Sequence, residues 1–360
     1  MTRQVLFISN FVGNGGAGRV LMELACELRR RGALVEVLSF MRWPGEYAFD
    51  EDIPVLYGPH AESRPEHIGK RRLRREEAAW VREMVSRRPG AVVVSFEYFV
   101  NMVAALGCRG LPNRLVGSER NDPSREGGRF PTTHIRNVLY RELDALVCQT
   151  PEARDYFRPA VRARSLVIAN PVKAGLPAPW TGRRSRRIVN FCRLEPQKNL
   201  RLLVEAFSTF LMGHPGYQLE IYGDGSERDA LRAFVSDCGL GASVSIRPAR
   251  QDIHEAVRDA AMFVSTSDSE GLSNSMLEAM ALGLPTICTD CPCGGAHLVI
   301  RDGENGLLVP VGDRSAVIEA MGRVASDPGF AERLGEEATR VRGDYSLAAI
   351  CDRWEEVLWP

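Results

Sequence analysis

The sequence has no net charge and no long apolar run. Its 46 basic residues (Lys and Arg) and 46 acidic residues (Asp and Glu) cancel, so the charge balance gives no reason to expect a nucleic-acid partner. No apolar stretch approaches the roughly 20 residues that span a bilayer, so we expect at most a peripheral contact with a membrane. The N-terminus lacks the apolar core of a signal peptide. Together with nine scattered cysteines, this favours a reducing, cytoplasmic location.

The usual metal-binding patterns are missing too. Cys288, Cys291 and Cys293 are spaced C-x2-C-x-C, but no second Cys or His pair stands at zinc spacing, so plain thiols are favoured over a zinc site. An Asp-x-Asp pair after a strand would hold Mg²⁺ between two phosphates, and the nearest match is Asp268-Ser269-Glu270. We therefore expect no metal.

The first 40 residues predict a strand, a glycine-rich turn, a helix and a second strand. These elements are expected at residues 4–9, 13–18, 19–31 and 34–40. The turn contains Gly15 and Gly16, which leave the backbone open at the carboxyl end of a strand, where ligands bind. A strict G-x-G-x-x-G and the acidic residue that holds an NAD ribose are both missing, so dinucleotide binding is the weaker interpretation.

Strands and helices continue to alternate in both halves of the chain. Further strands are expected at 91–95, 114–117, 145–149, 166–169, 187–192, 218–222, 243–246 and 261–265, and helices at 98–106, 132–143, 200–212 and 227–238. Residues 170–179 contain three prolines and interrupt this pattern. The length and the interruption predict two α/β domains, 1–170 and 171–340, followed by a helical segment at 341–360.

One stretch of the second half carries two glutamates eight positions apart. A buried strand leads into a loop with Glu270, and a short helix with Glu278 follows. Ser273 and Asn274 are good N-cap residues, and the amide groups from Leu272 onward suit a phosphate at a helix N-terminus. Nearby carboxylates would accept hydrogen bonds from hydroxyl groups. A phosphorylated sugar has both a phosphate and hydroxyl groups. Spacing alone, however, favours the alternative in which the first glutamate caps amides and the second is solvated.

Other strand exits of the second half add groups that suit a nucleotide. Arg193 and Lys198 follow its first strand, and two cations there suit a diphosphate. Gly223 and Gly225 follow its next strand, where glycine lets the backbone approach a ligand or simply turn. A later strand-exit loop with Arg250 offers donors and acceptors to a nucleobase, although the base cannot be read from it.

Together, these residues resemble a known family. The set consists of Gly15, Gly16 and Ala17, of Arg193 and Lys198, of Gly223, Asp224 and Gly225, and of Glu270 with Glu278. In this order and over most of the chain, it resembles family 4 retaining glycosyltransferases of GT-B fold. Residues 118–123, 290–295 and 302–309 resemble the bacterial capsule, exopolysaccharide and glycan-assembly members. The resemblance implies two Rossmann-like domains facing across a cleft, with the last helix packing back on the first domain.

The resemblance also implies that the second domain binds a nucleotide-sugar donor. Arg193 and Lys198 would bind the diphosphate, Glu278 the ribose and Glu270 the donor sugar, so that Arg193, Lys198 and Glu270 are the catalytic candidates. Further donor-binding candidates are Gly15, Gly16, Gly223, Gly225, Arg250, Leu272, Ser273 and Asn274. Retention in this family is discussed as front-face attack assisted by the leaving phosphate. No enzymic nucleophile, resident cofactor or metal is then required.

For the substrates, the resemblance favours a UDP-sugar donor, carrying a hexose or an N-acetylhexosamine, over GDP-mannose. A glycan or lipid-linked saccharide acceptor would bind the first domain. The family often places a histidine where this chain has residues 118–122, so Arg120, Asn121 and Asp122 are the acceptor-binding candidates. The helix context of His134 indicates a structural or surface histidine.

The run from Lys70 to Arg75 is dense in basic residues and begins a helix. Most such runs are solvated helix faces. In a transferase with a lipid-linked acceptor, this run would instead contact anionic headgroups or a diphosphate. Each cation near an anionic surface then contributes about 1 kcal/mol of binding free energy. Two other functions stay open at this point. One is a GT-B-like UDP-sugar epimerase with its own acid and base, and the other is a non-catalytic nucleotide-sugar-binding subunit.

Overall fold

A computed structural model describes residues 3–13, 15–45, 49, 52–63, 69–127 and 130–360. Asn14 of the predicted glycine-rich turn and the side chain of Lys70 lie outside this description. The chain divides into two compact units. The first comprises Met1–Pro171 with Leu347–Pro360, and the second comprises Val172–Ser346.

The first unit is built on a seven-stranded sheet in which every strand pair is parallel. Its strands are β1 (Gln4–Ser9), β2 (Leu34–Ser39), β3 (Val55–Tyr57), β4 (Val92–Phe96), β5 (Leu115–Ser118), β6 (Ala145–Cys148) and β7 (Ser165–Val167). They lie in the order β3-β2-β1-β4-β5-β6-β7. β1 and β4 are almost entirely buried, which explains their continuous apolar runs, because a parallel sheet is covered on both faces.

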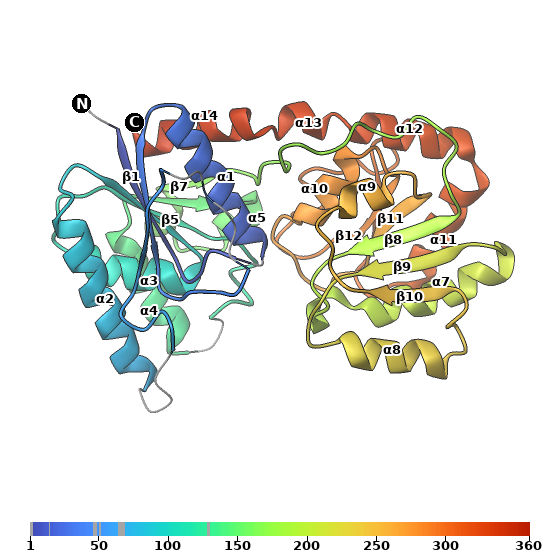
Figure 1. Ribbon diagram of the computed structural model, residues 1–360, viewed down its shortest axis with the longest axis horizontal. Coiled ribbons are helices and arrows are strands. Elements are labelled where there is room, and N and C mark those ends of the chain that lie inside the picture. Colours follow the sequence, from blue (N-terminus) through green and yellow to red (C-terminus); the bar gives the residue numbers. More distant parts are fainter. Residues whose placement is uncertain (1–2, 14, 46–48, 50–51, 64–68, 128–129) are drawn as a thin grey trace. The chain divides into compact units, whose positions relative to one another are not determined.

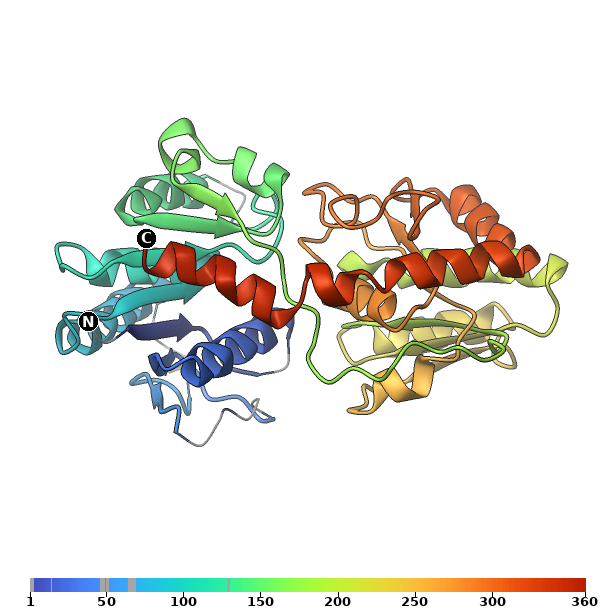
Figure 2. The ribbon, with the colours of Figure 1, turned by 90° about the horizontal axis from the view of Figure 1, so that it is seen from above.

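Helices cover both faces of this sheet. They are α1 (Gly16–Arg30), α2 (Lys70–Ser86), α3 (Tyr98–Cys108), α4 (Thr132–Leu139), α5 (Pro151–Asp155), α6 (Pro159–Arg162) and α14 (Leu347–Leu358). In Figure 1, α2, α3 and α4 lie on one face, and α1 and α14 lie on the other. Figure 2 shows α14 lying across the strands of this unit. Its Trp354 is buried and stacks on Phe96 of β4, with 5.9 Å between ring centroids, so the C-terminal helix completes the core of the first unit.

The second unit repeats the plan with six parallel strands. Its strands are β8 (Arg187–Phe191), β9 (Gln218–Tyr222), β10 (Val244–Arg247), β11 (Met262–Ser265), β12 (Thr286–Thr289) and β13 (Leu307–Val309), in the order β10-β9-β8-β11-β12-β13. Its helices are α7 (Leu200–Gly213), α8 (Arg228–Asp237), α9 (Ile253–Val257), α10 (Asn274–Ala281), α11 (Arg314–Ser326), α12 (Pro328–Ala338) and α13 (Val341–Asp344). In Figure 1, α7 and α8 lie on one face of the sheet, and α9 and α10 lie on the other. The predicted pair of Rossmann-like α/β units is confirmed.

Most predicted elements are confirmed, some to the residue. The strands at 4–9 and 218–222 have the predicted bounds. The first helix begins at Gly16, three residues before its predicted start, because the end of the glycine-rich turn is already helical. The helix predicted at 132–143 ends at Leu139 and continues as a short 3-10 turn, Tyr140–Glu142. Six short elements were not predicted, and each is only three to five residues long: β3, β12, β13, α5, α6 and α9.

Each sheet reverses its strand order at one place. The reversal lies between β1 and β4 in the first unit and between β8 and β11 in the second. Connections from such a strand pair leave toward opposite faces of the sheet, and ligands of open α/β sheets bind in the crevice at the carboxyl ends of those strands. Each unit therefore has one topologically favoured ligand position.

Candidate active site

In the second unit, the loops that follow β8 and β11 are bonded to each other at the strand-order reversal. The amide of Asp268 donates to the carbonyl of Gln197 at 2.8 Å, and Asn199 Nδ2 donates to Asp268 Oδ1 at 2.8 Å. Thr266 Oγ1 adds a bond to the Asn199 carbonyl at 3.0 Å. These bonds fix both loops before any ligand binds, which is the preorganisation that a binding or catalytic site requires.

Lys198 and Glu270 form an ion pair across these two loops. Lys198 Nζ contacts Glu270 Oε1, and Ser267 Oγ donates to the same carboxylate oxygen at 2.8 Å. The Ser267 carbonyl accepts bonds from Thr289 Oγ1 at 2.6 Å and Cys291 Sγ at 2.9 Å. The two charged side chains are only 11% and 16% exposed, so little solvent screens them. The structure thus brings together two residues that the sequence assigned to one site.

Arg193 lies in the same loop as Lys198, but its side chain is exposed. The structure shows no hydrogen bond or ion pair between its guanidinium and any described residue. Burial raises the pKa of the neighbouring Cys192 thiol to about 12, although the charges of Lys198 and Arg193 lower it. Because it is exposed and has no partner among the described residues, the guanidinium of Arg193 is placed to bind an anion from solution.

α10 begins at the same edge of the sheet. Ser273 is its N-cap, and Ser273 Oγ accepts a bond from the amide of Met276 at 3.3 Å, so the predicted cap is confirmed. The amides of the first turn, beginning at Asn274, precede the first intrahelical bonds and carry the positive end of the helix dipole. Leu272, just before the cap, is buried, which leaves only its backbone groups for a ligand.

Glu278 is buried in the second turn of α10. Its side chain is 8% exposed, and Oε2 lies 2.8 Å from Nε2 of His254, which belongs to α9 and is 7% exposed. The ring of His254 also packs edge-on against Phe191 at the end of β8. The alternative of a solvated Glu278 is therefore excluded, because α9 covers this side of α10. Sequence reasoning missed His254, whose only signal was its position just after the loop that carries Arg250.

Gly223 and Gly225 allow two strand-exit loops to touch. A Cβ on Gly223 would lie 1.9 Å from the Cys192 carbonyl oxygen, and one on Gly225 would lie 2.3 Å from that of Leu194. Both carbonyls belong to the loop that carries Arg193. Backbone packing alone thus requires glycine at these two positions.

A second close backbone contact lies behind the start of α10. A Cβ on Gly295 would lie 1.7 Å from the carbonyl oxygen of Gly271, in the loop between Glu270 and the N-cap. The turn after β12 therefore supports that loop directly through main-chain atoms.

Arg250 follows β10, and its exposed side chain is bonded to the carboxylate of Asp252, with Nε 2.6 Å from Oδ1. Gly15 and Gly16 belong to the first unit, unlike the other donor-binding candidates. Gly15 is the extended N-cap of α1, and Gly16 is the first residue of that helix.

The acceptor-binding candidates follow β5 in the first unit. Arg120 is buried, bonds to Asn170 Oδ1, and lies 4.9 Å from the centroid of the Phe96 ring. Burial lowers the pKa of Arg120 to about 9. This value is still above neutral pH, so the guanidinium remains charged. Asp122 Oδ1 accepts bonds from the amide and hydroxyl of Ser124 at 2.9 and 2.6 Å, and Asn121 bonds to Glu126. In this structure the three side chains hold their own loop in place.

Beside this loop lies a buried polar network that sequence reasoning missed. Glu119 is fully buried, and Tyr140 donates its hydroxyl to the Glu119 carboxylate. Asn101 Nδ2 bonds to the Tyr140 oxygen at 3.2 Å and to the Ser118 carbonyl at 3.1 Å. Burial, followed by the nearby charge of Glu126, raises the pKa of Glu119 to about 7. No local sequence pattern predicts such a network, because its members come from the end of β5, from α3 and from the turn after α4.

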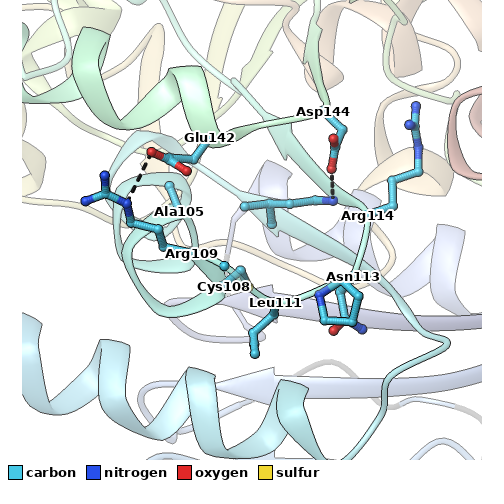
Figure 3. Close-up of a pocket in the computed structure, with 11 residues that line it drawn as sticks. Ala105, Cys108, Arg109, Leu111, Asn113, Arg114, Glu142 and Asp144 are labelled. Carbon is cyan, nitrogen blue, oxygen red and sulfur yellow. Dashed lines mark hydrogen bonds and ion pairs between the residues drawn. The ribbon is translucent and has the colours of Figure 1, made fainter.

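A hollow of about 310 Å³ also opens at the amino end of β5, the opposite end of the sheet from the reversal point (Figure 3). Its charged groups are already engaged with one another or with backbone. Arg109 Nε lies 3.5 Å from Glu142, and Asp144 accepts a bond from the amide of Leu115 at 2.7 Å. This hollow therefore offers few unengaged charges to a ligand.

Two further findings concern metals and membranes. Within the described ranges, no three or more His, Cys, Asp or Glu side chains are grouped so that they could hold a metal ion. Burial raises the pKa of the Cys291 thiol to about 11, so it is protonated at neutral pH. No helix in the described part of the chain has the length and apolar character needed to cross a bilayer.

Comparison with known families accounts for both units. The family described as "Glycosyl transferase 4-like domain" matches residues 15–171, and "Glycosyl transferases group 1" matches residues 185–327. The chain belongs to the family 4 glycosyltransferases of GT-B fold. The predicted family is therefore confirmed, and the site at the reversal point of the second unit lies in a glycosyltransferase.

Two similar proteins are named for exopolysaccharide or lipopolysaccharide chemistry. An exopolysaccharide phosphotransferase of Streptomyces coelicolor is 31% identical over 219 residues, which are 60% of this glycosyltransferase and 23% of that protein. The lipopolysaccharide core biosynthesis glycosyltransferase LpsE of Rhizobium meliloti is 28% identical, over 64% of this chain and 68% of LpsE. The chain thus spans less than a quarter of the first relative. A structure of S. aureus TarM with fondaparinux, α-GlcNAc-glycerol and UDP has a TM-score of 0.83 at 12% identity, over 100% of both chains, which shows the shared fold.

Proposed function

We propose that this glycosyltransferase moves a hexosyl or N-acetylhexosaminyl group from a UDP-sugar to a glycan or lipid-linked saccharide, with retention of anomeric configuration. The observation that carries the proposal is the Lys198–Glu270 pair beside the N-terminus of α10. A cation and a helix N-terminus suit a diphosphate, and a carboxylate suits sugar hydroxyls. The UDP bound to TarM and the polysaccharide function of LpsE support this choice of substrates.

The second unit binds the donor in this proposal. Lys198 and Arg193 bind the diphosphate, Glu270 orients the donor sugar, and Glu278, held by His254, accepts hydrogen bonds from the ribose hydroxyls. The remaining donor contacts of this unit are Gly223, Gly225, Arg250, Leu272, Ser273 and Asn274, and Gly15 and Gly16 are the donor-binding candidates of the first unit. The acceptor binds the first unit, near the loop of Arg120, Asn121 and Asp122.

In the reaction, the bond between the anomeric carbon and the diphosphate oxygen breaks, and an acceptor hydroxyl attacks the same face of the sugar. The hydroxyl proton passes to the leaving phosphate, so the protein supplies no nucleophile. The charges of Lys198, Arg193 and the α10 N-terminus stabilise the negative charge that grows on the diphosphate. The proposed reaction uses no metal and no resident cofactor.

The proposed location is the cytoplasm, with a peripheral contact to the inner face of the membrane. The contact would use the run from Lys70 to Arg75, in which Arg71, Arg72 and Arg75 are exposed, although Arg72 is also paired with Glu76 at 2.8 Å. Each cation near an anionic surface contributes about 1 kcal/mol.

The test is a donor screen with purified protein. UDP-glucose, UDP-N-acetylglucosamine and GDP-mannose are supplied with a lipid-linked saccharide acceptor, and nucleotide release is measured with and without EDTA. We expect UDP release that EDTA does not change, and an NMR spectrum in which the new linkage keeps the donor's anomeric configuration. Loss with EDTA and recovery with Mg²⁺ would refute metal independence. An epimerised donor in the absence of acceptor would indicate an epimerase, and UDP-sugar binding without turnover a non-catalytic subunit.

A further inference from the structure

The first unit has a pocket at its own strand-order reversal. It measures about 340 Å³ and is lined by Asn10 after β1, by Glu97 and Tyr98 after β4, and by side chains from α2 and α3. Pockets that bind small molecules have volumes from about 300 Å³ upward. The pocket therefore occupies the position where the topology of the first unit favours a ligand.

Glu97 holds an unusual backbone conformation at this pocket. Its φ angle is +76°, in a region that a residue other than glycine rarely adopts. Its amide donates to the Ser118 carbonyl at 2.9 Å, and its own carbonyl accepts the Asn101 amide at 2.9 Å, so neighbouring strand and helix hold the strain in place. Strain of this kind costs on the order of 1–3 kcal/mol and concentrates at functional sites. Here it accompanies a carboxylate in the pocket wall.

The lining combines carboxylates with aromatic rings. Glu97 and Glu126 are acceptors when ionised, so they suit a ligand that presents several hydroxyl donors. Tyr98 and Phe99 supply flat apolar surface, against which the C–H face of a sugar ring can pack. Glu126 also accepts a bond from Asn121, which links the pocket to the loop that the sequence assigned to the acceptor.

Arg74 adds a cation to the same wall. Its guanidinium lies 5.2 Å from the centroid of the Phe99 ring, and the structure shows no ion pair or hydrogen bond from it to a described residue. Two other arginines of the basic run, Arg71 three residues before Arg74 and Arg75 directly after it, are exposed. An anionic group on the ligand would be attracted to this end of α2.

We propose that this pocket binds the acceptor as a hexopyranose that carries a phosphate ester or a carboxylate. The ring packs on Tyr98 and Phe99, its hydroxyls donate to Glu97 and Glu126, and its anionic group lies against Arg74. The inference rests on the proposed function only in calling this sugar the acceptor.

Isothermal titration calorimetry with saturating UDP, which occupies the donor site, tests the proposal. Glucose 1-phosphate and glucuronic acid distinguish the two anions, and glucose and inorganic phosphate test each half of the ligand alone. We expect at least one of the anionic sugars to bind about tenfold or more tightly than either glucose or phosphate. If inorganic phosphate binds as tightly as both anionic sugars, the proposed contacts to the sugar ring are wrong. If glucose binds as tightly as both anionic sugars, the proposed role of Arg74 is wrong.

Variants locate the binding in this pocket. Arg74→Ala should weaken the anionic sugar about tenfold and leave glucose unchanged, whereas Glu97→Gln should weaken both. Glu126→Gln serves as the second carboxylate variant if Glu97→Gln lowers Tm. Arg109→Ala removes an arginine from the hollow of Figure 3 and should change nothing. Equal binding by all variants overturns the pocket assignment. Failure of UDP itself to bind would instead refute the proposed donor site.

Discussion

The two units share one strand plan but surround their reversal points with different charges. In the second unit, the loops after β8 and β11 present Lys198, the exposed Arg193 and the N-terminus of α10. In the first unit, the loops after β1 and β4 lead into a pocket with Glu97 and Glu126. Cations with a helix N-terminus favour a diphosphate. Carboxylates with aromatic rings favour a hydroxyl-rich sugar ring, and Arg74 in the same pocket favours an anionic group on that sugar. Topology thus sets where a ligand binds, and the loop side chains set which ligand it is.

The largest expected effect comes from removing Lys198, the largely covered cation of the second unit. Lys198→Ala should lower kcat by about 10² or more, because it removes stabilisation of the charge on the leaving diphosphate. Steady-state kinetics with the preferred UDP-sugar measure this. Lys173→Ala, a lysine outside the loops after β8 and β11, is the matched control and should retain wild-type rates. Unchanged kcat in Lys198→Ala would remove the main difference proposed between the units.

The next effect concerns His254, which we interpret as a positioning residue. His254→Ala removes the partner of a buried carboxylate, and a hydrogen bond to a charged group contributes about 1.5–3 kcal/mol. We expect KM for the UDP-sugar to rise about tenfold or more, with a smaller change in kcat. His254→Gln, which keeps a side-chain amide donor, should recover part of the loss. A general loss of stability would show equally in Tm for both variants and would contradict the positioning role.

The smallest effect is a pH dependence of stability in the first unit. Burial raises the pKa of Glu119 to about 7, so its contribution to stability is complete below the unfolded-state pKa, near 4.5, and is lost as pH rises through about 7. Glu119→Gln cannot ionise. The Tm difference between variant and wild type should therefore move in favour of the variant from pH 5 to pH 8, by roughly 2–4 °C for each kcal/mol of penalty removed.

Glu142→Gln is the control for this measurement, because its carboxylate is on the surface of the same unit. Its Tm difference from wild type should stay constant over the same pH range. A constant difference for Glu119→Gln as well would show that the buried carboxyl does not titrate there.

The sequence predicted most of the fold because the main strands contain short apolar runs and the longer helices have clear periodicity. β1 and β9 match to the residue, whereas β3 has three half-buried residues and no pattern to detect. Lys198 and Glu270 were predicted to share a site, because both follow strands of one parallel sheet. The roles assigned to them stay predictions.

The partners of buried polar residues were not predictable in the same way. His254 and Glu278 are 24 positions apart, and Tyr140 and Glu119 are 21 apart. These pairs depend on how a short helix or turn packs on its neighbour, which no periodicity records. The φ angle of Glu97 is likewise imposed by bonds to β5 and α3, and it has no signature in the local sequence.

The contact between Gly295 and the Gly271 carbonyl also bears on how mutational data for this protein would be interpreted. In a scan of every substitution, position 295 should tolerate replacement as poorly as a ligand-binding residue, since even a methyl group would displace the loop before α10. Yet glycine has no side chain with which to bind or react. Loss of function on substitution at this position would therefore reflect a main-chain contact that supports the loop. A functional map based only on such losses would wrongly assign a ligand contact to position 295, where two backbone segments touch each other.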